Sequence, residues 1–336
     1  MLIVSVLRRA AARAPNKPAL IIGGRSMDYQ ELNGRSWDIA TRLLTAGVAP
    51  GDRVALHMHN SLDLAVAYFA CFQAGAVAVP INTRMKAAEI AYVLDHSEAS
   101  LYLGQPELFT EIAELPAGFP AVRQWVTELH KIDALASSPL ARELPTVAAE
   151  QTAAILYTSG STARPKGVIH THHSLSYIGR GFGITWGDVV VPMTPLVHVA
   201  ALAALLASFE ATATVATLAQ FDPYAVLDAV ARLQATFLWG TPVLYNALIA
   251  AQTTWPRDVG SIRRCLAGGD VVPLALKTEF AQCFGRPLRE LLGSTENGLI
   301  AVNESDIPSQ ADSFGRASLS GRGLPRLRRH ALFQAG

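Results

Sequence analysis

Short β-branched segments alternate with longer alanine- and leucine-rich segments along most of this 336-residue chain. Arg53–Met58, Ala76–Ile81 and Thr152–Tyr157 are predicted to be buried strands, and Leu62–Gln73 and Pro223–Leu233 are predicted to be helices. Strands that alternate with helices favour largely parallel sheets with helices on both faces. The pattern predicts an α/β fold, with further strands at Ser100–Leu103, Asp188–Val191, Thr212–Thr217 and Thr236–Leu238 and further helices at Thr83–Leu94 and Pro195–Phe209.

The composition indicates two domains, or one large lobe with subdomains, around a substantial core. Half of the residues are apolar and 16% are charged. Lys and Arg (28) nearly balance Asp and Glu (27), and five arginines follow the last acid, Asp312. The remainder of the chain is therefore slightly acidic, which argues against recruitment of nucleic acid by charge.

The cysteines and the apolar segments argue against a secreted or membrane-spanning protein. Cys71, Cys265 and Cys283 are odd in number and widely spaced, so we expect reduced core residues in a cytoplasmic protein. The apolar stretch Leu64–Ile81 contains Pro80, which would break a spanning helix near its end. A buried helix followed by a strand explains this stretch better.

One segment carries most of the chemistry: Tyr157-Thr158-Ser159-Gly160-Ser161-Thr162-Ala163-Arg164-Pro165-Lys166-Gly167-Val168. Hydroxyls and backbone amides donate to phosphate oxygens, glycine allows a close approach, and lysine adds positive charge. It is not a Walker A loop, because Gly167 follows Lys166 where Ser or Thr is required. A flexible linker would rarely sit between a buried strand and a helical segment, so we predict a phosphate-binding loop.

This loop resembles the signature loop of the AMP-forming adenylating enzymes, which include acyl-CoA synthetases. Further motifs similar to those of the family follow in the family's order, over roughly residues 5–316: Met27–Asn33, Gln73–Asn82, Pro195-Leu196-Val197-His198, Ala267-Gly268-Gly269-Asp270 and Leu292-Gly293-Ser294-Thr295-Glu296. Pro80-Ile81-Asn82-Thr83-Arg84 looks more like an acyl-CoA synthetase than a peptide-synthetase module. Several motifs in one order are more specific than any single match.

The resemblance implies a fold and a reaction. Residues 1–316 would form the family's N-terminal lobe, two packed βαβ-type subdomains with largely parallel sheets. A carboxylate would attack the α-phosphate of ATP, and the thiol of CoA would then displace AMP. The nucleotide would be bound by Thr158, Ser159, Gly160, Ser161, Thr162, Lys166, Gly167, Gly268, Gly269, Asp270, Leu292, Gly293, Ser294 and Thr295.

The resemblance also implies roles in catalysis for Lys166, His198, Thr295 and Glu296. Lys166 would bind the β- and γ-phosphates, and Thr295 the α-phosphate. Glu296 would coordinate Mg²⁺, a cation that prefers oxygen ligands. His198 would lie beside the substrate carboxylate.

Three departures from the family pattern affect these expectations. Ala163 replaces a usual glycine, and Leu292 replaces a tyrosine that would stack on adenine. After Arg316 the family would continue with Pro-x-x-Pro-Gly, whereas residues 317–336 form a basic tail without family pattern. We interpret the tail as a shift of reading frame or a pseudogene feature, rather than a basic recruitment segment. The barrel subdomain and the C-terminal α+β domain would then be lacking, and turnover would be weak or absent.

Other motifs are given structural interpretations. His170, His172 and His173 have no acidic partner nearby in sequence, so we prefer a strand end or helix entry to a metal site. Gly179–Gly183 misses the dinucleotide spacing and is interpreted as a turn. The proline-rich stretch Leu115–Pro145 is the predicted connection between lobes.

Two functions remain open from the sequence. The first is an acyl-CoA ligase acting on an aliphatic or aryl acid, and the second is a non-catalytic module that binds ATP or AMP. Neither the acid nor the oligomeric state is specified by the motifs.

Overall fold

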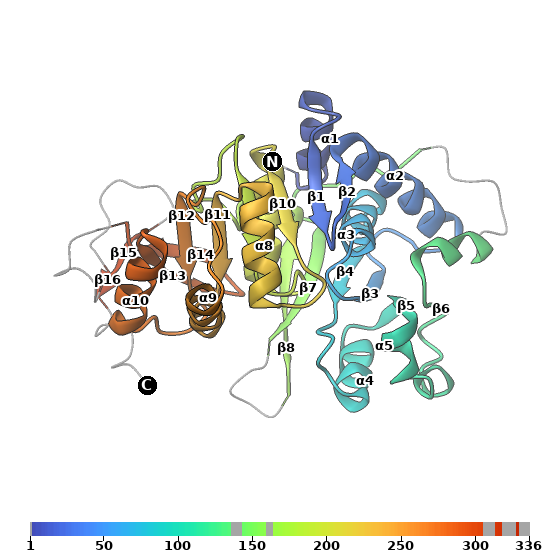
Figure 1. Cartoon of the computed structure of the whole chain (residues 1–336). Coiled ribbons are helices and arrows are strands. Elements are labelled where there is room, and N and C mark those ends of the chain that lie inside the picture. Colours follow the sequence, from blue (N-terminus) through green and yellow to red (C-terminus); the bar gives the residue numbers. More distant parts are fainter. Residues whose placement is uncertain (1, 136–142, 159–163, 305–312, 318–326, 329–336) are drawn as a thin grey trace. The chain divides into compact units, whose positions relative to one another are not determined.

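The computed structural model describes residues 2–135, 143–158, 164–304, 313–317 and 327–328. The chain divides into two compact units, Met1–Tyr177 and Ile178–Gly336 (Figure 1). Each unit contains a largely parallel sheet with helices against it, so the predicted α/β fold class is confirmed.

The first unit contains a six-stranded sheet in the order β6-β5-β3-β4-β7-β8. All neighbouring strands are parallel except β7 and β8. A hairpin of β1 (Pro18–Ile22) and β2 (Arg25–Asp28) precedes it. The other elements are α1 (Val4–Arg13), α2 (Tyr29–Thr45), β3 (Arg53–His57), α3 (Leu62–Ala74), β4 (Val77–Pro80), α4 (Ala87–His96), β5 (Ala99–Gly104), α5 (Pro106–Thr110), the 3₁₀ helices η1 (Leu115–Gly118) and η2 (Leu129–Leu135), β6 (Gln124–Val126), β7 (Thr152–Thr158), β8 (Lys166–Thr171) and α6 (His172–Leu175).

Helices cover both faces of this sheet. The connection β3-α3-β4 steps along the sheet in one direction and β4-α4-β5 steps back in the other. Right-handed crossovers therefore put α3 and α4 on opposite faces. On the α4 face, Ile90, Val93 and Leu94 pack against Ala55 and Tyr102.

Helix α3 is the central helix of the first unit. Every residue in it except Asp63 is buried, and α2 packs along it. Ser61 caps its start by accepting a hydrogen bond from the Leu64 amide at 3.0 Å, and Gly75 ends it in the left-handed conformation. The prediction of a buried helix followed by a strand is thus confirmed. Among the described residues, no helix is long and apolar enough to cross a membrane.

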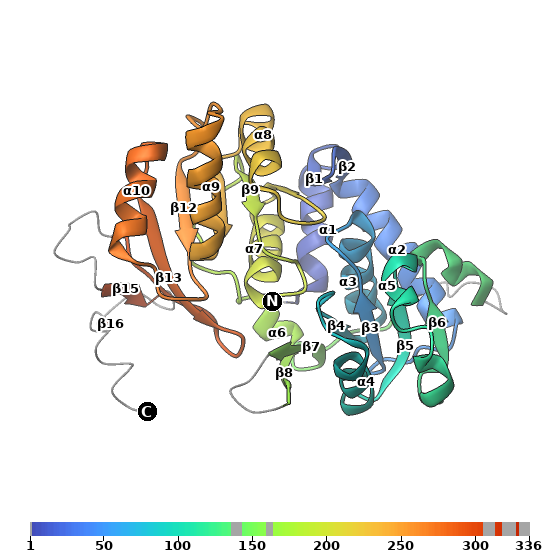
Figure 2. The same ribbon diagram turned by 60° about the horizontal axis from the view of Figure 1, so that its bottom comes forward.

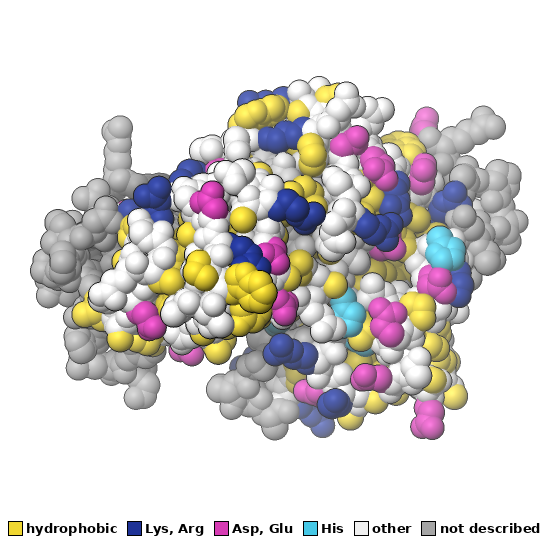
Figure 3. Space-filling model, viewed as in Figure 1, with side chains coloured by type: hydrophobic (Ala, Val, Ile, Leu, Met, Phe, Trp, Pro, Cys, Tyr) yellow, Lys and Arg dark blue, Asp and Glu magenta, His cyan; other side chains and the backbone are white. Residues whose placement is uncertain are grey.

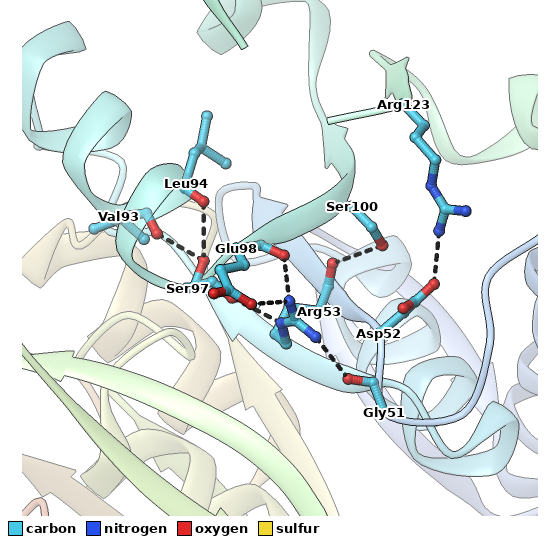
Figure 4. A network of polar contacts seen from close by, with 9 residues as sticks. All are labelled: Gly51, Asp52, Arg53, Val93, Leu94, Ser97, Glu98, Ser100 and Arg123. Atoms are coloured by element: carbon cyan, nitrogen blue, oxygen red, sulfur yellow. Dashed lines mark hydrogen bonds and ion pairs between the residues drawn. The ribbon is translucent and has the colours of Figure 1, made fainter. Parts of the chain in front are cut away.

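A polar network around Arg53 joins the amino ends of β3 and β5 (Figure 4). The Arg53 guanidinium donates to the backbone oxygens of Ser97 (2.7 Å), Gly51 (3.2 Å) and Glu98 (2.8 Å), and to the Glu98 carboxylate (2.9 Å). Glu98 has a φ of 50°, a conformation that favours glycine. Arg53 therefore holds a tight turn between α4 and β5.

In the second unit the strands run in the order β10-β9-β11-β12-β13-β14-β15-β16. Strands β10, β9, β11, β12 and β13 are parallel, and the strands after β13 are antiparallel. Its elements are β9 (Val189–Pro192), α7 (Val199–Glu210), β10 (Thr214–Thr217), α8 (Pro223–Leu233), β11 (Phe237–Gly240), α9 (Pro242–Thr254), β12 (Arg264–Ala267), α10 (Leu274–Phe284), β13 (Leu288–Ser294), β14 (Gly298–Val302), β15 (Ser313–Ala317) and β16 (Leu327–Arg328).

Helices α8, α9 and α10 lie side by side against the second sheet (Figure 2). The step from β9 to β10 runs opposite to the steps that lead to β11, β12 and β13. By the same handedness rule, α7 covers the other face. The buried Tyr245 hydroxyl of α9 donates to the Leu238 and Leu266 carbonyls at 3.1 and 2.9 Å, which fixes α9 against the sheet.

Four sequence predictions about local structure are wrong. Helix α7 begins at Val199 rather than Pro195, because His198 is its N-cap residue. The segment after the loop, Lys166–Thr171, is strand β8 rather than a helix, because its β-branched residues pair with β7. Helix α4 begins at Ala87 rather than Thr83, because the Asn82 side chain accepts from the Arg84 amide and holds a turn. Leu115–Pro145 lies inside the first unit and contributes β6, so it does not connect the units.

The structural interpretation of two motifs is confirmed. The Gly179–Gly183 segment forms turns, with positive φ at Gly181 and Gly183. The histidines lie where a strand ends and a helix begins, because β8 ends at Thr171 and α6 begins at His172, and His170 bonds to the Ser174 hydroxyl at 3.3 Å. Cys71 and Cys265 are buried free thiols, whereas Cys283 is only partly buried.

Candidate active site

In the first unit, the predicted phosphate loop connects the two strands of a hairpin. Thr158 at the end of β7 is the register partner of Lys166 at the start of β8. Lys166 is exposed, whereas Thr158 is half-buried. The hairpin therefore holds the two ends of the loop together. The other predicted loop residues Ser159, Gly160, Ser161 and Thr162, and the departure Ala163, lie outside the described residues.

Packing at the base of the loop explains Gly167. A Cβ at this position would lie 2.8 Å from Ile155 and 3.2 Å from the Tyr157 ring, so a side chain would collide with β7. The Tyr157 hydroxyl lies 2.8 Å from Nδ1 of His96 on α4. Burial raises the pKa of Tyr157 to about 12, which keeps the phenol neutral at physiological pH. The base of the loop is thus anchored to α4.

In the second unit, the histidine motif, the glycine turn and the Leu292–Glu296 motif all lie at the carboxyl ends of parallel strands, at the same edge of one sheet. The register pairs Trp239 with Pro192, Gly240 with Ala267, and Ala267 with Glu290. Because these strands are parallel, the segments after β9, β11, β12 and β13 all begin at their carboxyl ends. Ligands of open α/β sheets bind at this edge.

His198 lies at the start of α7, after β9. It is the N-cap residue of the helix, and its side chain is exposed. Its carbonyl accepts the first hydrogen bond of the helix from Leu202 at 3.0 Å. The structure therefore places the histidine at the carboxyl edge rather than in the core.

The glycine turn after β12 has no room for a side chain at its first residue. A Cβ on Gly268 would lie 2.7 Å from the Leu291 carbonyl oxygen and 3.1 Å from the Trp239 ring. Its amide donates to the Gly240 carbonyl at 3.1 Å, and Gly269 follows with a φ of +82°. The backbone of Gly268 is thus pressed against β11 and β13, whereas Gly269 and Asp270 are exposed.

The last motif forms the turn between β13 and β14. Leu292 pairs with Ala301 and is half-buried, and Gly293 and Ser294 pair with Leu299 and Gly298. The Ser294 hydroxyl accepts from the Asn297 amide at 3.3 Å, which closes a turn that contains Thr295 and Glu296. Thr295 is half-buried, and Glu296 is exposed.

The donors at this turn fit the Mg²⁺ that the resemblance implies. Glu296 offers a carboxylate, and Thr295 beside it offers a hydroxyl, so both donors are oxygens. Mg²⁺ commonly takes one or two carboxylates and completes its shell with phosphate oxygens and water. One exposed carboxylate is therefore sufficient for the protein's share of such a site.

Sequence reasoning missed Glu290, which lies on β13 between the two motifs of this edge. Its side chain is fully buried and forms an ion pair with Lys277 of α10 at 2.7 Å. The sequence signal is an acid within the apolar strand Leu288–Ser294, where a buried charge requires a partner.

Comparisons of the sequence with known proteins show which family it resembles. The sequence model of the AMP-binding enzyme family matches residues 7–324. A feruloyl-CoA synthase from Amycolatopsis sp is 34% identical over 315 residues, covering 91% of this chain and 62% of the relative. The medium-chain fatty-acid–CoA ligase of Escherichia coli (strain K12) is 29% identical, covering 90% of this chain and 56% of the relative.

The fold has counterparts among solved structures. The inhibitor-bound N-terminal domain of FACL13 from Mycobacterium tuberculosis superposes with a TM-score of 0.85 at 26% identity, covering 94% of this chain and 82% of that chain. The chain spans less than two thirds of the length of the curated relatives described above.

Proposed function

The chain belongs to the family of AMP-binding enzymes, and we propose on this basis that it activates a carboxylic acid with ATP and transfers the acyl group to CoA. One observation carries the proposal. His198, the Gly268–Asp270 turn and the Thr295–Glu296 turn are far apart in sequence, yet they leave the carboxyl edge of the same sheet. This edge is where α/β proteins bind nucleotides.

The proposed chemistry proceeds in two steps. A carboxylate oxygen of the acid attacks the α-phosphorus of ATP, the bond to pyrophosphate breaks, and an acyl-adenylate forms. The thiolate of CoA then attacks the acyl carbon, and AMP leaves. Such reactions require positioning and charge neutralisation rather than a protein nucleophile.

In this proposal, positioning and charge neutralisation come from residues that the structure describes. Lys166 would neutralise charge on the β- and γ-phosphates, and Thr295 would donate to the α-phosphate. Glu296 would coordinate Mg²⁺, which would withdraw charge from the phosphate oxygens. His198 would orient the substrate carboxylate. The Gly268–Asp270 turn would border the adenine, where Leu292 offers an aliphatic contact instead of an aromatic one.

Named relatives suggest the range of acids to test. They include a feruloyl-CoA synthase and a medium-chain fatty-acid–CoA ligase, so an aryl or an aliphatic acid is proposed. A panel of ferulate, benzoate and fatty acids of increasing length covers both classes.

The test is a hydroxylamine trap of the acyl-adenylate. The chain is incubated with ATP, Mg²⁺ and each acid, and hydroxamate is measured. We expect hydroxamate from at least one acid, its loss on removal of Mg²⁺ by chelation, and a large decrease in Lys166→Ala. Lys131→Ala is the matched control, because Lys131 is exposed in the same unit and pairs with Glu128 away from the loop.

The same experiment separates the competing function. A non-catalytic module would bind ATP or AMP saturably, with affinity reduced in Lys166→Ala, and would release no pyrophosphate with any acid. Hydroxamate that is unaffected by Lys166→Ala would contradict the proposed role of the loop. Formation of the CoA thioester is measured separately, by adding CoA in place of hydroxylamine.

A further inference from the structure

Glu290 brings a carboxylate into the interior of the second unit. Its side chain has no exposed area, and it lies on β13 directly opposite Ala267 of β12. Ala267 is the last residue before the glycine turn, and Leu292 lies two residues after Glu290. The carboxylate thus lies between the two segments to which the proposed function assigns nucleotide binding.

The contacts of this carboxylate connect three elements. One oxygen accepts from Lys277 Nζ, in the first turns of α10, at 2.7 Å. The other oxygen accepts a longer, buried hydrogen bond from the Val272 amide at 3.4 Å. Val272 closes the segment that begins at Gly268, and Lys277 lies in the first turn of the helix that follows it, which begins at Leu274. The glycine turn is therefore tied to β13 beyond its own strand pairing.

The contribution of this ion pair to folding stability does not explain well why a buried pair of charges occupies this position. Burying two charges costs solvation, and an apolar pair of similar volume is often as stable or more stable. The Lys277 side chain is only 13% exposed, so both charges bear this cost. An apolar pair, however, offers no acceptor to the Val272 amide.

We propose that Glu290 is a positioning residue that fixes the Gly268–Val272 turn for nucleotide binding, with Lys277 as its counter-charge. This inference rests on the proposed function, because it assigns the turn to the nucleotide. Glu290 does not touch the reacting atoms. It acts through the backbone of the turn, whose first residue lies so close to β13 that a Cβ on Gly268 would come within 2.7 Å of the Leu291 carbonyl oxygen.

Two double variants separate positioning from stability. Glu290→Met with Lys277→Met replaces the ion pair with apolar side chains of similar length and removes the acceptor. Glu290→Gln with Lys277→Met also removes both charges, but the glutamine oxygen still accepts from the Val272 amide. A purely structural ion pair predicts the same behaviour for both variants.

We expect urea unfolding of the Met/Met variant to require no less urea than the wild type, while its affinity for AMP falls by about fivefold to twentyfold. The Gln/Met variant restores most of the affinity. In an active chain, KM for ATP rises and KM for the acid does not. Equal AMP affinity in the Met/Met variant and the wild type overturns the proposal.

Amide hydrogen exchange of the free protein tests the positioning role directly, without any need for catalytic turnover. The amides of residues 268–273 exchange faster in the Met/Met variant than in the wild type or the Gln/Met variant. Unchanged exchange refutes the positioning role. A wild type that binds no AMP refutes the proposed function instead, and the exchange rates still decide whether Glu290 orders the turn.

Discussion

Acid should weaken the second unit through Asp188, the residue before β9. Its carboxylate is almost fully buried and accepts from Arg263 Nε at 2.7 Å, from the Thr236 hydroxyl at 2.6 Å, and from the Thr185 amide and hydroxyl at 2.6 and 2.9 Å. Burial alone would raise the pKa of Asp188, but these hydrogen bonds outweigh it and lower the pKa from 3.8 to about 2. The network joins the amino ends of three strands.

The magnitude follows from proton linkage. Because the pKa is lower in the folded state, the stabilisation is complete well above pH 3.8 and is lost as the pH falls towards 2. The difference in pKa corresponds to about 2.4 kcal/mol at neutral pH, of which about 1.3 kcal/mol remains at pH 3. Asparagine at position 188 does not titrate, so it lacks this term.

The assay compares the urea unfolding free energies of the wild type and Asp188→Asn at pH 7 and pH 3. We expect the wild-type advantage to shrink by about 1 kcal/mol between the two pH values. Asp95→Asn is the control, because Asp95 is exposed on α4. An advantage that is equal at both pH values would refute the assignment of this acid sensitivity to Asp188.

Three further predictions concern the turns and the buried histidine. Gly268→Ala should lower the unfolding free energy by about 1–3 kcal/mol and weaken AMP binding, measured by urea unfolding and calorimetry, because its Cβ would meet a β13 carbonyl. Arg53→Met should destabilise the first unit by about 1–3 kcal/mol, whereas Glu98→Gly should be neutral or stabilising, because it relieves the positive φ and loses only an exposed ion pair (Figure 4). His172 packs against Phe72 with neither ring nitrogen hydrogen-bonded, and burial lowers its pKa from 6.5 to about 4. Protonation therefore favours the unfolded chain, so the wild type loses stability as the pH falls from 6.5 to 4. In His172→Leu the slope of the unfolding free energy against pH should be smaller in this range, by the amount that corresponds to the uptake of about one proton on unfolding; urea unfolding at several pH values measures it.

Helices with a capping residue at their start were predictable from the sequence, because their hydrogen bonds and caps involve residues only a few positions apart. Pro223–Leu233 is a helix with the predicted bounds, because the Asp222 side chain accepts from the Ala225 amide and Pro223 opens the first turn. The predicted helix Leu62–Gln73 differs from α3 by one residue at its end, and Ser61 and Gly75 cap the two ends. The modest net charge also agrees with the visible surface, where basic and acidic side chains are interspersed (Figure 3).

Predictions failed where pairing with a distant segment decided the structure. Lys166–Thr171 is a strand because β7 pairs with it, and Leu115–Pro145 belongs to the first unit because β6 pairs with β5. Nothing within either segment specifies its partner. The hydrogen bonds of a strand are made with another strand, whereas those of a helix are made within a few residues.

The sequence by itself determined the α/β class, the family motifs and their order, since each depends on residue types at fixed short spacings. Only the tertiary structure decided that Gly268 lies against Leu291 and that His198 and Thr295 share one edge. It alone placed Glu290 between the two segments that we propose bind the nucleotide, and paired it with Lys277. These relations depend on strand order and register, which arise from burial and pairing across long sequence separations and therefore leave no local pattern.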